Sequence, residues 1–131
     1  MSLFVIPIKI TKRIRILAAE DDEINYLYIK ELLRAPNFEL VWARDGLEAV
    51  EQFRKGPDFD VVLIDVKMPV MNGYDATVMI KKINAGIPVI AVTAYNRQED
   101  ISRATGVNFD GYVVKPIEKN DLMLKIRNVL S

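Results

Sequence analysis

Carboxylate side chains follow an apolar stretch near the start of the chain. Residues 14–19 are mainly apolar, and the next four residues, Glu20, Asp21, Asp22 and Glu23, are all acidic. Two negative charges about 4 Å apart repel by about 1 to 4 kcal/mol at effective dielectric constants of about 80 to 20, and a bound divalent cation reverses that term. The cluster therefore predicts a cation site. The alternative is that Asp22 or Glu23 only caps a helix, where acidic residues are also favoured.

Three more reactive groups follow apolar runs in the same way. Asp65 comes after residues 61–64, Thr93 comes after residues 89–92, and Lys115 comes after a short run that begins at Tyr112. Taken singly, they are explained as a loop aspartate, a strand threonine and a surface lysine. Their joint occurrence at the ends of apolar runs in one small chain favours a shared site over three separate explanations.

Alternating strands and helices are predicted to position these groups. Apolar runs that indicate strands cover residues 14–19, 38–43, 60–65, 88–92 and 112–114. Most are apolar on both faces, as in a buried parallel sheet. The pattern predicts an α/β fold with helices on both faces of the sheet, and such sheets bind ligands beyond the carboxyl ends of their strands. If the first and third strands are neighbours, Asp65 joins Asp21 in an acidic pocket suited to Mg²⁺.

Apolar residues at spacings of three and four predict the helices. The expected core stripes are Ile24, Tyr28, Leu32 and Leu33 in the first helix, and Leu122, Ile126, Val129 and Leu130 in the last. Asn96 and Glu99 resemble a capping pair for a helix through Arg103, and Asn108 lies where a helix exit tolerates a left-handed residue.

Composition excludes several kinds of chemistry. The 131 residues are half apolar, as expected of one domain with one core. The 18 basic and 18 acidic residues cancel, so net charge gives no reason to expect direct nucleic-acid binding or an anionic membrane partner. There is no cysteine or histidine, which removes disulfides, thiolates, imidazole bases and the usual zinc ligands. Oxygen donors remain, and these favour magnesium or calcium.

The first 13 residues are predicted to be a leader or linker, and residues 14–131 to be the folded domain. The apolar run at residues 3–10 is far shorter than the roughly 20 residues of a membrane span. It also lacks the features of a secretory signal. A cytoplasmic location is therefore expected.

Four segments together resemble a known family. "ILAAEDDEIN" resembles the acidic-pair motif of response-regulator receiver domains, and "VVLIDVKMPVMNG" resembles their phosphoacceptor motif. "PVIAVTA" and "GYVVKP" resemble the switch-hydroxyl and lysine-proline motifs. The resemblance runs from Ile14 to Leu130 and implies a flavodoxin-like (βα)5 fold with a five-stranded parallel sheet in the order 2-1-3-4-5. The wording "AEDDEIN" and "VTAYNRQED" is more similar to receivers attached to hybrid sensor histidine kinases.

The resemblance also implies a function and a role for individual residues. A histidine kinase or phosphotransfer domain is the expected phosphoryl donor in a His-Asp phosphorelay, and a fused or separate output partner reads the result. The domain is then a phosphoacceptor that assists its own phosphorylation and dephosphorylation, rather than an enzyme. The resemblance implies that Asp65 is the phosphorylation site. It implies that Mg²⁺ binds to Asp21, Asp65 and the Lys67 carbonyl, and to Glu20 through a water. It also implies that Lys115 and Thr93 contact the phosphoryl group, and that Thr93 and Tyr112 act as the switch.

Three other interpretations remain open from the sequence. A flavin-binding module shares this architecture, but it needs a phosphate-binding loop where this chain has acids. An aspartyl phosphatase would need a second acid at the position of Lys67. A receiver-like interaction module without phosphorylation is the third. Two departures from the family pattern are Glu20 in place of aspartate and Asn108 in place of a helix-exit glycine.

Overall fold

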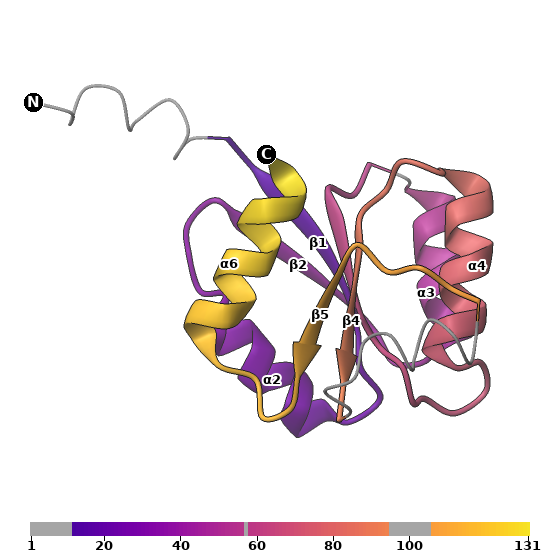
Figure 1. Cartoon of the computed structure of the whole chain (residues 1–131), viewed down its shortest axis with the longest axis horizontal. Helices are drawn as coiled ribbons and strands as arrows, with labels where there is room; N and C mark the ends of the chain where they lie inside the picture. The colour runs from indigo at the N-terminus through magenta and orange to yellow at the C-terminus, as the bar shows by residue number, and fades with distance from the viewer. Residues whose placement is uncertain (1–11, 57, 95–105) are drawn as a thin grey trace, which may run out of the picture.

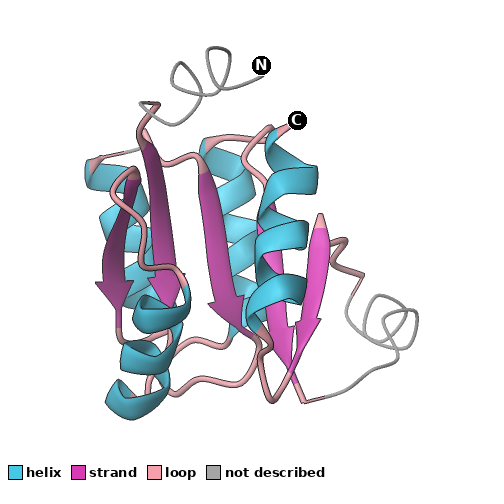
Figure 2. Cartoon of the chain, turned by 90° about the vertical axis from the view of Figure 1, so that its left-hand side faces the viewer, coloured by secondary structure: helices cyan, strands magenta, loops and turns pink. Residues whose placement is uncertain are grey.

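A computed structural model describes residues 12–56, 58–94 and 106–131 of the chain. Five strands of the described chain form one parallel sheet in the order β2-β1-β3-β4-β5. Their bounds are β1 Ile14–Ala19, β2 Phe38–Ala43, β3 Val61–Asp65, β4 Val89–Thr93 and β5 Gly111–Val114. All five run in the same direction, so their carboxyl ends meet at one edge (Figure 2). The predicted flavodoxin-like fold and strand order are confirmed.

Helices cover both faces of this sheet (Figure 1). One face carries α2 (Glu23–Leu32) and α6 (Lys119–Leu130), and the other carries α3 (Gly46–Lys55) and α4 (Gly73–Ile83). Successive residues of a strand point to opposite faces, so Ile16 joins the core cluster beneath α2 and α6 while Leu17 joins the one beneath α3 and α4. Both side chains are fully buried. The sheet is therefore fixed from both sides, which makes its carboxyl edge a rigid platform.

The core face of α2 differs from the predicted one. Ile24 and Tyr28 are 77% and 48% exposed, whereas Tyr26 and Ile29 are 7% and 2% exposed. Leu33, just after the helix, is buried as expected. The prediction was wrong for Ile24 and Tyr28 because this helix is apolar on more than one side, so the sequence contains two stripes with helical spacing. Packing against the sheet selects the stripe that contains Tyr26 and Ile29.

Smaller corrections concern the end of the chain and a loop. Leu122 and Ile126 of α6 are buried as predicted, but Leu130 in the last turn is 36% exposed. Gly106 rather than Asn108 has left-handed backbone, with φ +70°, because glycine has no Cβ to clash there. The expected capping pair at residues 96 and 99 lies outside the described residues.

Two further expectations concern membrane spans and the leader. None of the helices in the described ranges is long and apolar enough to cross a membrane. Of the predicted leader at residues 1–13, only residues 12 and 13 fall within the described chain, so its boundary with the domain stays a prediction.

Val70 has a backbone conformation that β-branched residues avoid. Its φ is +69°, and the Met71 N–H donates to the Pro69 carbonyl at 2.7 Å, which closes a tight γ-turn after β3. A positive φ is an outlier for a β-branched residue and costs roughly 1–2 kcal/mol, while asparagine adopts a positive φ several-fold more often than most residues. The Val70 side chain is 77% exposed, so little burial is lost on its replacement. We expect Val70→Asn to raise the free energy of unfolding by about 1 kcal/mol in chemical denaturation.

The matched control for this prediction is Val78, an exposed valine in the helical backbone of α4. Val78→Asn should give no gain, because valine and asparagine have similar helix propensities and Val78 has no positive φ to relieve. A Val70→Asn protein that is less stable than the wild type would contradict the assignment of strain to Val70.

Candidate functional site

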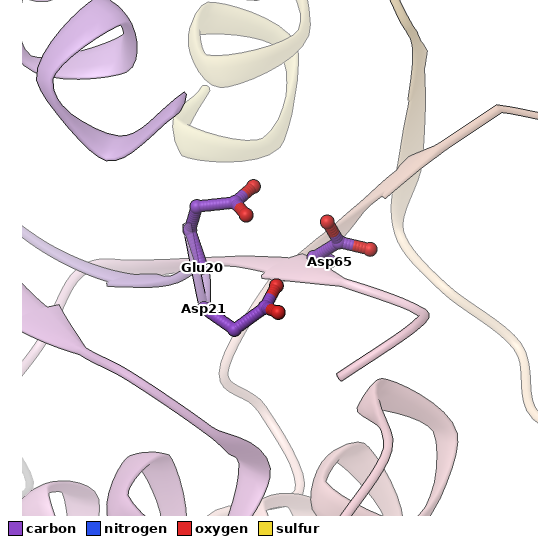
Figure 3. Close-up of side chains that lie close together, drawn as sticks. All are labelled: Glu20, Asp21 and Asp65. Carbon is purple, nitrogen blue, oxygen red and sulfur yellow. The ribbon is translucent and has the colours of Figure 1, made fainter. Parts of the chain in front are cut away.

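The carboxyl ends of β1 and β3 bring three acidic side chains together. Ala19 pairs with Ile64, and Glu20 and Asp65 are the next residues along the chain from each. Figure 3 shows the carboxyl groups of Glu20, Asp21 and Asp65 gathered at one place. One carboxylate oxygen from each lies within 4.8 Å of the others. The pairing of β1 with β3 therefore brings Asp21 and Asp65 close together, as predicted.

A cavity of about 210 Å³ lies over these carboxylates. Six of the seven residues singled out from the sequence line it: Glu20, Asp21, Asp65, Lys67, Thr93 and Lys115. Thr93 ends β4 and Lys115 follows β5 directly, so four of the five strands deliver a group to this cavity or to its edge. The cavity combines negative, positive and hydroxyl groups within one small volume.

Asp65 is held on both of its carboxylate oxygens. The residue is 5% exposed, its Oδ2 accepts from the Lys115 Nζ at 2.7 Å, and its Oδ1 accepts from the Lys67 backbone N–H at 2.9 Å. Burial of the Lys115 ammonium disfavours its charge, yet the hydrogen bond and the charge of Asp65 outweigh this and raise the pKa of Lys115. Lys115 therefore stays protonated and faces Asp65. The Lys115–Pro116 peptide bond is cis.

Glu20 has the most perturbed carboxyl group of the site. It is 2% exposed, its Oε2 accepts from the Asp22 backbone N–H at 3.1 Å, and the Lys115 Nζ lies 3.8 Å from its Oε1. Burial raises the pKa of Glu20 to about 7; the Asp22 N–H opposes this rise, and the nearby charge of Asp65 adds to it. Glu20 thus titrates near neutral pH when no cation is bound.

Asp22 caps a helix, unlike its acidic neighbours Glu20 and Asp21. Its Oδ1 accepts from the backbone N–H groups of Ile24 at 2.8 Å and Asn25 at 3.3 Å, which makes it the N-cap of α2. The capping alternative considered for this residue is therefore confirmed. Glu20, Asp21 and Asp65 remain as the group that could hold a metal ion.

Thr93 and Tyr112 lie on the same face of the sheet but not around the same cavity. Thr93 is 1% exposed and lines the acidic cavity. Tyr112 pairs with Ala91, two residues before Thr93, and is half-buried against the core beneath α3 and α4. Its ring and the ring of Phe109 form a T-shaped pair with 5.6 Å between ring centres. Tyr112 is the one predicted residue that does not line the cavity.

Gly73 is a residue that the sequence reasoning did not assign to the site. A Cβ added there would overlap the carbonyl oxygen of Asp65 and lie 2.8 Å from the Val66 Cα. The Gly73 N–H donates to the Val66 carbonyl at 3.1 Å, so the start of α4 packs directly on the chain that holds Asp65. The only sequence signal for this contact was the Asn-Gly pair, which indicates a turn but not what the turn touches.

We expect Gly73→Ala to lower the free energy of unfolding by about 2–3 kcal/mol, because backbone atoms must move to admit the methyl group. Chemical denaturation measures this. Gly86→Ala is the control, since the nearest atom to an added Cβ there is the Asn84 Oδ1 at 3.6 Å. Equal effects of the two substitutions would contradict the close approach of Gly73 to Asp65.

The acidic group fits a hard divalent cation. It offers only oxygen donors, which Mg²⁺ and Ca²⁺ prefer. Asp21 is exposed, so the cluster opens to solvent and leaves room for the waters that Mg²⁺ retains. Without a cation, burial raises the pKa of Glu20 most and the charge of Asp65 raises it further, and a cation would relieve the cost that comes from this repulsion. Glu20, Asp21 and Asp65 are therefore suited to Mg²⁺.

Comparison with known proteins gives consistent matches. Residues 16–127 match the family model described as the response regulator receiver domain. The chemotaxis protein CheY of Halobacterium salinarum is 34% identical over 118 residues, which cover 89% of this chain and 97% of that protein. Hybrid signal transduction histidine kinase I of Dictyostelium discoideum is 35% identical over 111 residues, which cover 79% of this chain and 6% of the kinase.

Other relatives are longer than this chain, and solved structures share its fold. The chain spans about half (52%) of the uncharacterized transcriptional regulatory protein YbdJ of Bacillus subtilis, which is 33% identical over 120 residues and matches 92% of this chain. A receiver domain structure from Clostridium thermocellum has a TM-score of 0.80 at 30% identity, covering 89% of this chain and 94% of that one. A CheY-like receiver domain structure from Methanospirillum hungatei has a TM-score of 0.80 at 28% identity, covering 91% and 94%.

Proposed function

The chain belongs to the family of response regulator receiver domains, and on that premise we propose that Asp65 is the residue that accepts the phosphoryl group. Domains of this family are phosphoacceptors in two-component signalling. One observation carries the assignment to Asp65: it is a buried carboxylate, in contact with the Lys115 ammonium at 2.7 Å, at the base of an acidic cavity. We further propose that residues 14–131 form the receiver domain.

The proposed reaction is a displacement at phosphorus. A carboxylate oxygen of Asp65 forms a bond to the phosphorus atom, while the bond between phosphorus and the donor nitrogen of a phosphohistidine breaks and the electron pair stays with the imidazole. The Lys115 ammonium leaves its direct contact with Asp65 and neutralises a phosphoryl oxygen. The Thr93 hydroxyl, buried at the cavity wall, donates to another.

Magnesium completes the proposed site. Asp21, Asp65 and the backbone carbonyl of Lys67 would hold the ion directly, and Glu20 would hold it through a water. When bound, Mg²⁺ supplies positive charge that neutralises carboxylate and phosphoryl oxygens together. The support in this chain is the donor set of three clustered carboxylates. Assisted self-phosphorylation and dephosphorylation are part of the same proposal.

The proposed partners are a histidine kinase or phosphotransfer domain as donor and an output partner that is fused or separate. The similarity to a hybrid histidine kinase of Dictyostelium discoideum supports a receiver of the hybrid-kinase type. The relative YbdJ is named as a transcriptional regulatory protein and is about twice as long as this chain, so its name supports no transcriptional output for this chain.

The test is incubation of the purified protein with acetyl phosphate and Mg²⁺, followed by intact-mass measurement. We expect the mass to rise by one phosphoryl group, and the rise to disappear when a chelator removes Mg²⁺. A protein that stays unmodified by acetyl phosphate and by every phosphorylated histidine donor tested would be an interaction module instead. Absorbance of a bound flavin would revive the flavin-binding alternative.

We also propose that Thr93 and Tyr112 form the switch that reports phosphorylation. Both side chains lie on the same face of neighbouring strands, two register positions apart. Phosphorylation should draw the Thr93 hydroxyl toward the phosphoryl group and let Tyr112 turn inward. We expect the phosphoryl mimic beryllofluoride to shift the backbone amide signals of residues 93 and 112 in NMR spectra. Unchanged signals at both positions in a protein that binds the mimic would refute this switch.

A further inference from the structure

We propose that Trp42 is a positioning residue that holds the peptide between Glu20 and Asp21 in the orientation that Mg²⁺ binding requires. This inference rests on the proposed function, because it concerns the same cation site. Trp42 lies on β2 and pairs in register with Ala18, two residues before Glu20 on the chain. Its indole Nε1 donates a hydrogen bond to the Glu20 carbonyl oxygen at 2.7 Å. An edge-strand side chain therefore fixes the backbone between two of the three clustered acids.

The indole ring is itself restrained from two directions. The ring of Tyr26 on α2 stacks on it, with ring centres 4.6 Å apart and planes 7° apart. The guanidinium of Arg44 lies 4.8 Å from the centre of the Trp42 ring. Tyr26 is 7% exposed and anchored in the core-facing stripe of α2. The hydrogen bond to Glu20 therefore comes from a ring that cannot turn without breaking contacts with a helix.

Asp21 is the acid that depends most on this restraint. Glu20 and Asp65 are buried, and their carboxylates accept hydrogen bonds from backbone N–H groups or from Lys115. Asp21 is exposed, and within the described chain its carboxylate accepts no hydrogen bond. Its direction is therefore set by its own backbone, and the Glu20 carbonyl belongs to the peptide that precedes it. Holding that carbonyl limits how far the peptide can rotate.

The restraint matters because the three clustered acids repel one another. In the absence of a cation, Asp21 is repelled by Glu20 and Asp65, and rotation of the peptide that precedes Asp21 is the motion that relieves the repulsion. The Trp42 hydrogen bond opposes that rotation and keeps the three oxygens together. Groups that orient metal ligands without touching the metal typically change affinity by about 10–100-fold when removed. Trp42 is placed to act in this way on Mg²⁺ affinity.

The experiment compares Trp42→Phe with the wild type and with Tyr28→Phe. Trp42→Phe removes the N–H donor and retains an aromatic ring for Tyr26. Tyr28→Phe is the matched control, because the Tyr28 hydroxyl also donates to a backbone carbonyl at 2.7 Å, that of Ile117. The dissociation constant for Mg²⁺ is measured by NMR titration of backbone amides, and the rate of phosphorylation by acetyl phosphate is measured over a range of Mg²⁺ concentrations.

We expect Trp42→Phe to weaken Mg²⁺ binding by about tenfold, and its phosphorylation rate to return to the wild-type value at saturating Mg²⁺. Tyr28→Phe should bind Mg²⁺ as the wild type does. A merely structural role for Trp42 would instead lower the rate at every Mg²⁺ concentration. Unchanged Mg²⁺ affinity in Trp42→Phe would overturn the inference while leaving the proposed function intact, whereas a wild-type protein that neither binds Mg²⁺ nor accepts phosphoryl groups would overturn the proposed function.

A second variant keeps the inference testable if Trp42→Phe does not fold. Tyr26→Leu retains the indole donor and removes the ring that stacks on it. We expect its Mg²⁺ affinity to fall between those of Trp42→Phe and the wild type, with recovery at saturating Mg²⁺. Unchanged affinity in Tyr26→Leu would show that restraint of the indole ring does not matter for the site.

Discussion

Replacing Asp65 with asparagine is expected to lower phosphoryl incorporation from acetyl phosphate at least about a thousandfold, as removal of a covalent nucleophile usually does. An amide has no anionic oxygen with which to attack phosphorus, although it keeps nearly the same size and shape. The amide oxygen of the new side chain can still accept one of the two hydrogen bonds that Asp65 accepts, from Lys67 or from Lys115. The variant should therefore fold, and intact mass after incubation measures the loss.

The control for this prediction is Asp75→Asn, which removes an exposed carboxylate from the first turn of α4. That variant should be phosphorylated as fast as the wild type. Incorporation that persists at the wild-type rate in Asp65→Asn would mean that another side chain is the acceptor, and peptide mapping of the modified protein would identify it.

The same substitution should also change Glu20. Burial contributes most to the raised pKa of Glu20, and the charge of Asp65 adds to it. Removing the charge of Asp65 should therefore lower the pKa of Glu20 without returning it to the ordinary value. A pH titration of the Glu20 carboxyl carbon by NMR in Asp65→Asn measures this change. A higher pKa in the variant than in the wild type would contradict the charge coupling.

The sequence located the strands well because their signal is local. Buried parallel strands are apolar on both faces, and the predicted bounds of β1 and β2 match the observed ones. The predicted bounds differ from the observed ones by one residue at one end of β3 and β5 and by one residue at each end of β4, which is the usual uncertainty where a ladder begins or ends. The strand order came from the family resemblance, since periodicity does not specify which strands are neighbours. That order is what brings Asp65 beside Glu20.

Contacts between elements were harder to predict. Two apolar stripes on α2 had equal support in the sequence, and only the position of the sheet buries Tyr26 rather than Ile24. Tyr26 in turn stacks on Trp42, whose hydrogen bond to Glu20 depends on the register of β1 with β2. Gly73 touches Asp65 through backbone atoms that no side-chain pattern reports. Each of these contacts joins two elements that are far apart in the chain, so a local sequence pattern does not predict it.

Replacing Glu20 with glutamine is expected to stabilise the Mg²⁺-free protein above neutral pH. The pKa of Glu20 is about 7 in the folded protein against an ordinary 4.5, so the folded state binds a proton between these values that the unfolded state has released. The contribution of Glu20 to the free energy of unfolding therefore falls as pH rises from about 4.5 to about 7, and remains lower above that range. The difference corresponds to about 3 kcal/mol at most. Glutamine carries no charge, so Glu20→Gln should lack this loss.

Urea denaturation from about pH 4 to about pH 8 in a chelator measures this effect. Wild type and Glu20→Gln should have similar stability near the lower end of the range, and the variant should be more stable by about 2–3 kcal/mol at the upper end. Glu48→Gln removes another carboxylate of the chain, which accepts from the Arg44 N–H outside the cavity, and serves as the control. A wild-type stability that rises over the same pH range in parallel with the variant would contradict the raised pKa.

For Mg²⁺ affinity, the expected order of wild type and Glu20→Gln is the opposite of their order in stability. Wild-type Glu20 must lose its proton for its carboxylate to assist cation binding, so below about pH 7 the apparent Mg²⁺ affinity should fall by up to about tenfold for each pH unit. Glu20→Gln should show a weaker Mg²⁺ affinity at about pH 8 and almost none of this pH dependence. Under the proposed function, the burial that makes the charge of Glu20 costly is the same property that ties cation binding, and with it the proposed phosphorylation of Asp65, to pH near neutrality.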